Sequence, residues 1–542
     1  MILKPEYRFK PIKTVENIWG FDSEDDSKGY CIQAGVFNGS RFLIYEDINI
    51  HRLILLFKAL VKTGEKHYFF SNNILYDLVN VFGYEHLIEN LDSGEMEFII
   101  SKYNFIGAVY CRNIFFVDLQ NYYRNMSLGK IGELIGLKKL EFNPTSKEYL
   151  KRDIEISYFA GKNLIDFLAK NKFDFGLTIP SIALQIFKRY FLKTSFEETD
   201  EKTLDLLRTG YKGGRCEMYW QGERSPVHIY DINSLYPYIM TKTKFFNPNT
   251  IKPSFEIKEN GFYKVRLKLD ENLYLPLFPH ELNSIYPVGE FNTIALGSDL
   301  LPYKNNIQNI QWGVEFDYSG YLFKSYAVQM YQKRKNSLTS FDNTFFKILM
   351  NGLYGKFGQS KMKTVWKKGE GFTEENLGYS YYSQVIWSIQ ITCGARSYMF
   401  DRMNRILDKG IECYYTDTDS VHCSREIPKK YVDSKTLGFF KNEGRFESFT
   451  YLREKEYYSN DFKKYACKGI SGKENVETYF KTGKANFKSP IKFKESLRRG
   501  IQANIWIDRE KVKRQSKQKR QVFSDGSTKP LIFNENPYIL QP

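Results

Sequence analysis

The first 170 or so residues alternate short apolar runs with two helical stretches, and this alternation limits the possible folds more than any other feature. Apolar runs of four to eight residues are typical of strands. The runs are WGFD, YCIQAGVF, RFLIYE, HYFFS, FIGAVY and NIFFVDL, and the helical stretches lie around 51–63 and 149–169. Strands that alternate with helices predict an α/β domain at the N-terminus.

The remainder of the chain contains neither repeats nor long Gly/Ser linkers. Its pattern predicts a helix over about 180–208, a strand at VHIYDI, mostly β structure over 243–325, helices over 326–357 and a hairpin at 411–423. The last 90 residues have a mixed pattern that predicts both helices and strands. A chain of 542 residues with this variety predicts several domains.

Composition narrows the class of protein. The net charge of +16 favours a polyanionic partner, nucleic acid first and an anionic membrane second. Seven Cys without a CxxC pair and six His without HExxH favour carboxylates as metal ligands. The chain has no apolar run of about 18 residues, and MILKPEYRFK lacks the apolar core of a signal peptide. We therefore expect a cytoplasmic protein that handles nucleic acid, in the host cell if a phage encodes it.

Positions 492–520 carry eleven Lys and Arg against three Asp and Glu, which is half of the chain's excess charge. Such a run forms either a solvated face or a contact with phosphates, and the sequence leaves both readings open.

Paired carboxylates stand out in the N-terminal region. Asp22 and Glu24 lie two apart on a predicted strand, so both side chains leave the same face. Asp77 follows the run HYFFS, and Tyr149 and Asp153 share a helix face at i, i+4 spacing. Alone, the first pair reads as an exposed acidic turn. Together, four carboxylates could hold two divalent cations, and the phenol could orient an attacking water.

These segments, in this order, resemble the three exonuclease motifs of family B DNA polymerases. The resemblance implies that Asp22, Glu24, Asp77 and Asp153 are metal ligands, and that Asn73 and Tyr149 position the DNA end and the water. Ser127 and Leu128 resemble a single-stranded-DNA ligand motif, although Ser127 reads equally well as a helix N-cap.

A second set of carboxylates lies further along the chain. Asp231 stands where the strand VHIYDI ends, and Asp417 and Asp419 lie at the tip of the predicted hairpin. An isolated DTD is commonly a polar turn. In a basic chain, two such sites could hold two Mg²⁺ ions that activate a 3′-hydroxyl and neutralise a triphosphate.

Between these sites, Lys347, Asn351 and Tyr354 follow i, i+4, i+7 spacing and share a helix face. An ordinary amphipathic helix is the alternative, but the shared face is polar and aromatic. A cation, an amide and a ring on one face could contact phosphate, minor groove and base.

The three segments resemble motifs A (DxxSLYP), B (KxxxNxxYG) and C (DTD) of family B DNA polymerases. The resemblance implies that Asp231 and Asp419 are the main catalytic metal carboxylates, with Asp417 in support. It implies nucleotide contacts from Ile232, Tyr236, Lys335, Lys347, Asn351 and Tyr354. Tyr236 would exclude ribonucleotides, Tyr415 would line the site, and Gly352 stands where Ser is expected.

Two shorter segments extend the resemblance to DNA contacts. Tyr211, Gly213 and Gly214 resemble the YxGG element that touches the template, where glycine permits close approach to a phosphate. Lys455 and Tyr457 resemble the KxY motif that contacts the primer strand.

The resemblance implies a multidomain α/β protein, with an RNase H-like exonuclease domain before a right-hand polymerase. The palm would carry an RRM-like antiparallel sheet, beside helical fingers and a small thumb. The expected divisions are exonuclease 1–178, palm 179–242 and 386–450, a terminal-protein-region insert 243–325, fingers 326–358, a second insert 359–385, and thumb with basic C-terminal region 451–542.

The two inserts resemble the protein-primed branch of small phages and linear plasmids. In that branch the first insert contacts a terminal protein, and the second closes a ring round the DNA for strand displacement. We therefore expect a monomeric, proofreading, protein-primed DNA polymerase of a small linear genome. Its partners would be primer–template and single-stranded DNA, deoxynucleoside triphosphates and a terminal protein. Two Mg²⁺ or Mn²⁺ ions would occupy each site.

Three alternatives are weighed against this expectation. The same enzyme could start from a nucleic-acid primer or from none. A nuclease or a nucleic-acid-binding protein with an inactive polymerase site is disfavoured because Asp231, Asp417, Asp419 and Lys347 are all present. Reverse transcription is disfavoured because the hairpin reads TDTD and a proofreading domain is expected.

Overall fold

The computed structural model describes residues 2–6, 10–26, 28–101, 104–124, 126–470, 472–491, 495, 506–513 and 518–534. Most of the basic stretch 492–520 lies outside these residues. No helix among the described ranges combines the length and the apolar character that crossing a bilayer requires.

The N-terminal sheet has seven strands in the order β4-β3-β2-β5-β8-β7-β6, with β5 parallel to both β2 and β8. The strands are β2 (Asn17–Asp25), β3 (Cys31–Phe37), β4 (Phe42–Glu46), β5 (His67–Ser71), β6 (Met96–Ser101), β7 (Asn104–Tyr110) and β8 (Ile114–Asp118). Phe69 of β5 is buried towards α1 (Arg52–Val61), α2 (Ile74–Phe82) and α3 (Tyr84–Ser93). Its neighbour Phe70 is buried towards α5 (Lys147–Lys170). Both faces are covered, which explains why the middle of this strand, Tyr68-Phe69-Phe70, carries consecutive aromatic residues.

The sequence predicts one helix over about 180–208, and this prediction is wrong because the range contains several elements. The structure has α6 (Ile179–Ile186), a π-helical turn Phe187–Phe191, the short strand β9 (Phe196–Glu197) and α7 (Glu201–Thr209). The Asp200 side chain accepts a hydrogen bond from the Thr203 N–H, so it caps a new helix. Strand β9 pairs with β1 (Ile2–Leu3).

The central sheet has five antiparallel strands in the order β10-β21-β22-β12-β23. They are β10 (Cys216–Met218), β12 (Val227–Ile232), β21 (Cys413–Asp417), β22 (Ser420–Cys423) and β23 (Phe440–Phe446). The hairpin expected at 411–423 is β21 with β22. Helices α8 (Leu235–Lys242) and α12 (Val385–Leu407) contribute to the core beside this sheet.

The regular structure of residues 243–325 is mostly β, as the sequence predicts, and supplies all but the last strand of the lateral sheet, whose order is β14-β17-β15-β16-β31. Its strands are β14 (Lys252–Pro253), β15 (Gly261–Leu269), β16 (Val288–Leu296), β17 (Ile307–Glu315) and β31 (Ile532–Phe533). The region also contains α9 (Gly297–Leu300) and the pair β13 (Phe245–Phe246) with β18 (Tyr318–Gly320). Strand β31 is contributed by the C-terminal part of the chain, which the sequence did not predict.

The helical stretch 326–357 is two helices, α10 (Lys324–Lys335) and α11 (Ser340–Phe357), with Thr339 capping the second. The hairpin β19 (Met362–Lys367) and β20 (Gly371–Asn376) then turns back to the N-terminal sheet. There Trp366 Nε1 donates to Asp92 Oδ1 at 2.8 Å, and Phe372 stacks on Phe98.

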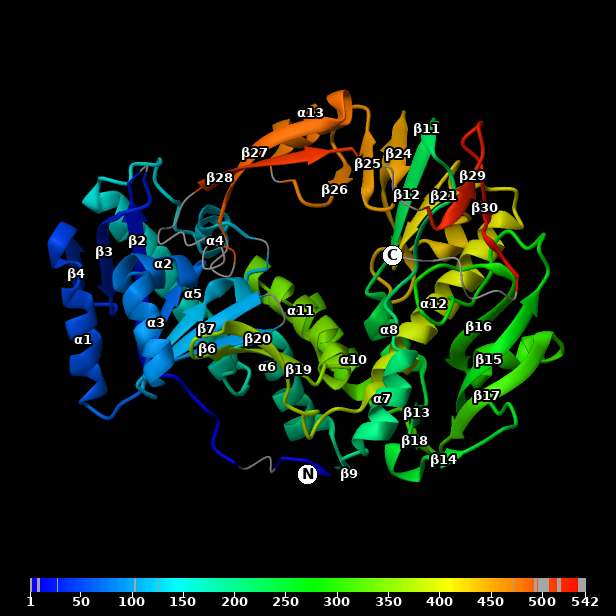
Figure 1. Ribbon diagram of the computed structural model, residues 1–542, viewed down its shortest axis with the longest axis horizontal. Helices are drawn as coiled ribbons and strands as arrows, with labels where there is room; N and C mark the ends of the chain where they lie inside the picture. The colour runs from blue at the N-terminus through cyan, green and yellow to red at the C-terminus, as the bar shows by residue number, and fades with distance from the viewer. Residues whose placement is uncertain are drawn as a thin grey trace.

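In Figure 1 the N-terminal sheet lies at one end of the molecule and the lateral sheet at the other, with α6, α10 and α11 between them. The small sheet β11-β24-β25-β26, helix α13 and the pair β27–β28 run along the upper side of that view. Their bounds are β11 (Gly222–Arg224), β24 (Phe449–Arg453), β25 (Glu456–Ser459), β26 (Tyr465–Cys467), α13 (Lys473–Thr482), β27 (Lys484–Pro490) and β28 (Trp506–Val512). Strands β29 (Arg520–Val522) and β30 (Thr528–Pro530) form a further pair.

Candidate active sites

Three N-terminal carboxylates meet where α5 crosses β2. Asp22 and Glu24 project from β2 and Asp153 projects from α5, with one oxygen of each within 4.8 Å of the others. Gly20 explains how the helix comes so near, because a Cβ there would lie 2.3 Å from the Ile154 carbonyl oxygen. The fold therefore gathers an acidic trio from segments 130 residues apart in the chain.

The trio carries more negative charge than its surroundings neutralise. Burial and the facing carboxylates of Asp77 and Asp153 raise the pKa of Asp22 well above its usual range. Burial and Asp153 raise the pKa of Glu24 to about 8. Asp153 Oδ1 is buried and has no hydrogen-bond partner. Crowded carboxylates with an unused buried oxygen are suited to a divalent cation.

Asp77 lies beside the trio rather than in it. Its carboxylate accepts hydrogen bonds from Ser23 Oγ at 2.7 Å and Ser71 Oγ at 2.5 Å. Burial raises its pKa to about 7 despite these bonds. The structure thus brings together three of the four predicted exonuclease ligands. It places the fourth, Asp77, next to them, where two serine hydroxyls already donate to its carboxylate.

Lys139 is a residue of this site that the sequence analysis missed. Its ammonium pairs with Asp153 and lies 4.8 Å from the ring centre of Tyr149. Tyr149 is buried, and desolvation raises its pKa to about 12, so the phenol keeps its proton at neutral pH. Lys139 is one of two adjacent lysines in GLKKLEF, and no spacing relates either of them to Asp153, so no sequence pattern could have identified it.

The predicted single-strand contacts are only partly exposed. Asn73 is exposed in a left-handed conformation (φ 74°) before α2, and its N–H donates to Asp118. Ser127 caps α4 (Leu128–Ile135) by accepting from the Lys130 N–H, as its alternative reading predicts. Leu128 is buried in the core. Asn73 and Ser127 are therefore exposed, whereas Leu128 is not.

In the central sheet, Asp231 is the penultimate residue of β12, and Asp419 lies in the turn after β21. Burial and the charge of Asp419 raise the pKa of Asp231 to about 7, and Lys347 opposes this shift. Burial also raises the pKa of Asp419 to about 6. The turn passes through Thr418 at φ 62°, and the Ile232 N–H donates to the Asp419 carbonyl oxygen at 2.8 Å. Ile232 itself is buried, so its N–H and side chain are both engaged within the sheet.

Asp417 is held by the residue predicted to contact the primer. Lys455 Nζ lies 2.6 Å from Asp417 Oδ2, and the Lys455 N–H donates to the Tyr415 hydroxyl. Tyr457 packs edge-on against Tyr415 with ring centres 5.0 Å apart. Both residues of the KxY-like segment therefore lie against the hairpin that carries Asp417 and Asp419.

Helix α11 presents its predicted face to this site. Lys347 is exposed, and its charge opposes the raised pKa values of Asp231 and Asp419. Tyr354 lies 4.6 Å from the ring of Tyr236, centre to centre. Asn351 is half-buried, one helical turn after Lys347 on α11.

Gly352 stands where the family resemblance leads us to expect Ser. A Cβ there would lie 3.4 Å from Pro180 of α6, so this position faces a helix contact.

Lys335 is exposed at the end of α10. Its neighbour Arg334 donates to Ser234 Oγ at 3.2 Å, directly after Asp231-Ile-Asn, and was not predicted. Arg334, the residue before Lys335, is thus the side chain that contacts the motif A segment.

The YKGG segment runs along the turn that carries Asp417 and Asp419. Tyr211 packs over Gly358 at the end of α11, and the Thr418 N–H donates to the Arg215 carbonyl oxygen at 2.7 Å. Arg396, another residue the sequence analysis missed, donates to the carbonyls of Lys212 and Gly213 at 2.8 Å each. Two neighbouring carbonyls are thereby fixed in one orientation.

Gly214→Ala should slow nucleotide addition strongly, whereas Gly213→Ala should not. A Cβ at Gly214 would lie 2.7 Å from Thr418 Cγ2 and 2.9 Å from its Cα, so the turn between Asp417 and Asp419 must move. A displacement of about 1 Å at a reacting group costs roughly a hundredfold in rate. Gly213 has open space around it within the protein, so Gly213→Ala would disturb only its predicted template contact, and it is the matched control when primer–template is saturating. Single-nucleotide addition rates of the two variants test this; equal rates would contradict it.

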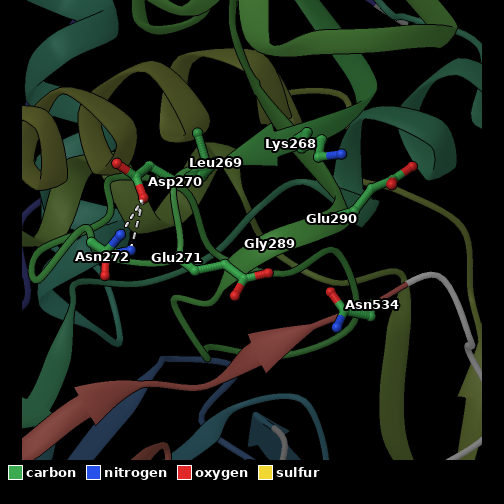
Figure 2. Close-up of a pocket in the computed structure, with 8 residues that line it drawn as sticks. All are labelled: Lys268, Leu269, Asp270, Glu271, Asn272, Gly289, Glu290 and Asn534. Atoms are coloured by element: carbon green, nitrogen blue, oxygen red, sulfur yellow. Dashed lines mark hydrogen bonds between the residues drawn. The ribbon is translucent and has the colours of Figure 1, made fainter.

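One pocket of about 560 Å³ lies elsewhere, where β15 and β16 meet the C-terminal strand. Figure 2 shows Asp270, Glu271 and Glu290 around it, with Asn534 across from them. Arg266 pairs with Glu290 at 2.5 Å, and Asp270 accepts from Asn272, so most of this charge is satisfied locally. The pocket contains none of the predicted site residues.

Comparison with known proteins identifies the fold. The solved structure of phi29 DNA polymerase complexed with primer-template DNA and incoming nucleotide superposes with a TM-score of 0.73 at 18% identity, over 92% of this chain and 100% of that one. The match confirms the predicted mixed α/β multidomain fold.

Sequence relatives point to the same group. A protein named "Probable DNA polymerase" from Neurospora intermedia is 28% identical over 327 residues, which cover 52% of this chain and 33% of that protein. The DNA polymerase of Bacillus phage Nf is 26% identical over 65% of this chain and 67% of its own length. The chain thus spans about a third of the Neurospora relative.

The family model described as "DNA polymerase type B, organellar and viral" matches residues 120–436. This stretch includes the segments of Asp153, Asp231, Lys347 and Asp419, and it confirms the resemblance drawn from the motifs. Because the match extends over more than half of the chain, the protein belongs to the organellar and viral DNA polymerases of type B.

Proposed function

We propose that the protein is a DNA-templated DNA polymerase with a 3′→5′ exonuclease. The observation that carries the proposal is the pair Asp231 and Asp419, held together at the ends of β12 and β21 with Lys347 facing them. Two coupled carboxylates opposite a cation are the arrangement that nucleotidyl transfer requires. The phi29 structure is named as binding primer–template DNA and nucleotides, which supports the same substrates here.

Divalent ions, Mg²⁺ or Mn²⁺, fit both carboxylate clusters. Asp231 and Asp419, with Asp417 in support, would hold two of them in the polymerase site. Asp22, Glu24 and Asp153, with Asp77 adjacent, would hold two in the exonuclease site. The raised pKa values of both clusters and the unpartnered Asp153 oxygen support this fit. Bound ions would supply a nucleophile at neutral pH and neutralise the leaving oxygens.

The remaining residues of each site would bind and orient substrate. Lys347 and Lys335 would attract the triphosphate, while Tyr236 and Tyr354 would limit the space around the sugar and base. Tyr149, protonated beside Lys139, would donate a hydrogen bond in the exonuclease site. Asn73 is exposed near that site and would contact the DNA end.

We further propose priming by a terminal protein, with strand displacement. Residues 243–325 form a separate sheet that would receive the terminal protein. The hairpin β19–β20 docks on the N-terminal sheet and would help to enclose DNA. The palm, fingers and thumb would be the central sheet, α10 with α11, and residues from 451 onward.

Purified protein with a labelled primer–template and Mg²⁺ tests the two activities together. With four deoxynucleotides the primer should lengthen, and without them it should shorten from its 3′ end. Chelation by EDTA should stop both reactions. A primer that only shortens would overturn the polymerase part of the proposal and support only the nuclease. A primer that stays unchanged would overturn the whole proposal.

Tyr236→Val should admit ribonucleotides. The Tyr236 ring packs on Tyr354, and shortening it opens the space that a 2′-hydroxyl needs. Steric discrimination of one small group is worth roughly 10- to 200-fold, so we expect a loss of about that size. The ratio of kcat/KM for dNTP to that for rNTP measures it. Unchanged sugar discrimination would remove Tyr236 as the gate.

A further inference from the structure

The segment 518–534, here called the C-terminal strap, runs along β10 and onto the lateral sheet. Lys519 Nζ donates to the Cys216 carbonyl at 2.9 Å, and the Gln221 N–H donates to the Gly526 carbonyl at 2.8 Å. The Val288 N–H donates to the Leu531 carbonyl, and β31 then pairs with β16. The strap therefore joins an outer strand of the central sheet to the lateral sheet.

The strap inserts one arginine into a buried ion cluster. Arg215 Nε and Nη2 donate to Glu217 Oε2 at 2.8 and 2.5 Å, and Arg520 Nη1 lies 3.9 Å from the same oxygen. All three side chains are at most 5% exposed. Removing one partner of such a buried cluster leaves the others uncompensated, so its geometry is tightly constrained.

Rings and carbonyls accommodate the excess positive charge of the two arginines. The Arg215 guanidinium lies 4.1 Å from the Tyr286 ring centre and donates to the Pro276 carbonyl. The Arg520 guanidinium lies 4.9 Å from the Tyr219 ring and 5.0 Å from the Tyr274 ring. Cation–π contacts of this kind stabilise desolvated guanidinium groups.

Arg520 has its own anchor within the strap. Its Nε donates to Thr528 Oγ1 at 2.9 Å, and that hydroxyl donates to the Tyr219 carbonyl. The guanidinium is thereby held in one position beneath β10.

This buried ion cluster adjoins the turn that carries Asp417 and Asp419. Glu217 is the register partner of Thr416, and Cys216 is the partner of Asp417. The Arg215 carbonyl accepts the Thr418 N–H between Asp417 and Asp419. Anything that fixes Arg215 and Glu217 therefore also fixes the turn that carries both carboxylates.

We infer that Arg520 is a positioning residue for the polymerase site, which acts through Glu217 to hold β10 against the Asp417–Asp419 turn. The inference rests on the proposed polymerase activity. It assigns the C-terminal strap a role in the rate of nucleotide addition, separate from any contact with DNA.

Arg520→Gln tests the inference. We expect kcat for single-nucleotide addition at saturating dNTP to fall about tenfold or more, because the turn is no longer fixed. The KM for dNTP and the Kd for primer–template should stay within about twofold, since the Arg520 side chain is buried within the protein. Arg520→Lys should restore most of the rate. Lys529→Gln removes the same charge from the same strap, where the side chain lies over only the Phe523 ring, and should behave as wild type.

Degradation of a single-stranded oligonucleotide, measured in the same preparations, should be unchanged because the exonuclease trio is remote in the fold. Equal losses in both activities would mean general unfolding and overturn the inference, as would a wild-type kcat in Arg520→Gln. If Arg520→Gln does not fold, Thr528→Val is the second variant, because it removes the hydroxyl that holds Arg520. We expect Thr528→Val to lower kcat by a smaller factor. An unchanged kcat in Thr528→Val would also overturn the inference. A wild-type protein that adds no nucleotide would instead overturn the proposed function.

Discussion

Replacing Asp231 or Asp419 by Asn should slow nucleotide addition about a thousandfold while 3′→5′ degradation continues. A carboxylate that holds a catalytic cation supplies several kcal/mol of charge stabilisation, and each ~1.4 kcal/mol is tenfold in rate. The measurement is single-turnover primer extension with Mg²⁺, beside degradation of a single strand by the same protein. The two carboxylate clusters lie on different sheets, so the effects should separate.

Loss of folding cannot imitate this result. Burial and Asp419 raise the pKa of Asp231 in the folded protein to about 7, so the fold loses stability as the pH rises from the ordinary carboxyl pKa to this value, and the loss is nearly complete at neutral pH. An uncharged Asn should leave the unfolding temperature equal or higher at neutral pH. Asp401→Asn makes the same change on the α12 surface, where Asp401 pairs with Arg405, and should leave synthesis intact. Undiminished synthesis in Asp231→Asn would contradict the assignment of the polymerase site.

The double variant Asp22→Asn with Asp153→Asn should have the opposite effect. Losing two of the three clustered carboxylates should reduce 3′→5′ degradation by about a thousandfold or more, by the same reasoning. Primer extension should persist, and misincorporated ends should remain in the product. Release of mononucleotides from a labelled single strand measures the loss.

Asp166→Asn is the matched control for this variant. Asp166 lies on the same helix α5 and pairs with Lys162 at the surface, so degradation should be unaffected. Degradation that survives in the double variant would show that other residues hold the ions, and Asp77 would be the first of these to examine.

The sequence predicted which residues lie together where a chemical pattern coincided with a single element. Asp22 and Glu24 lie on one strand, Tyr149 and Asp153 on one helix, and Asp417 and Asp419 on one hairpin, so spacing alone placed each pair. Their order along the chain then indicated the family. Spacing also predicted that Lys347 and Tyr354 share a helix face.

Residues that act through tertiary contacts left no such pattern. Lys139 reaches Asp153 from a loop, and Arg520 reaches Glu217 from the far end of the chain. Lys455 matched a DNA-contact motif, yet it pairs with Asp417, because the strand β25 that follows it packs beside the hairpin. The break near Asp200 was missed because its capping contact is a local hydrogen bond that overrides a helical pattern.

The central claim is that the Asp231–Asp419 site copies DNA. The most direct test supplies the purified protein with a primed single-stranded circle, Mg²⁺ and the four deoxynucleotides, without helper proteins, and follows product length. We predict strands many times the circle length, because synthesis would continue past one turn by displacing its own product. Synthesis that stops after one turn would retain the polymerase but contradict strand displacement. A primer that is degraded and never extended would contradict the central claim.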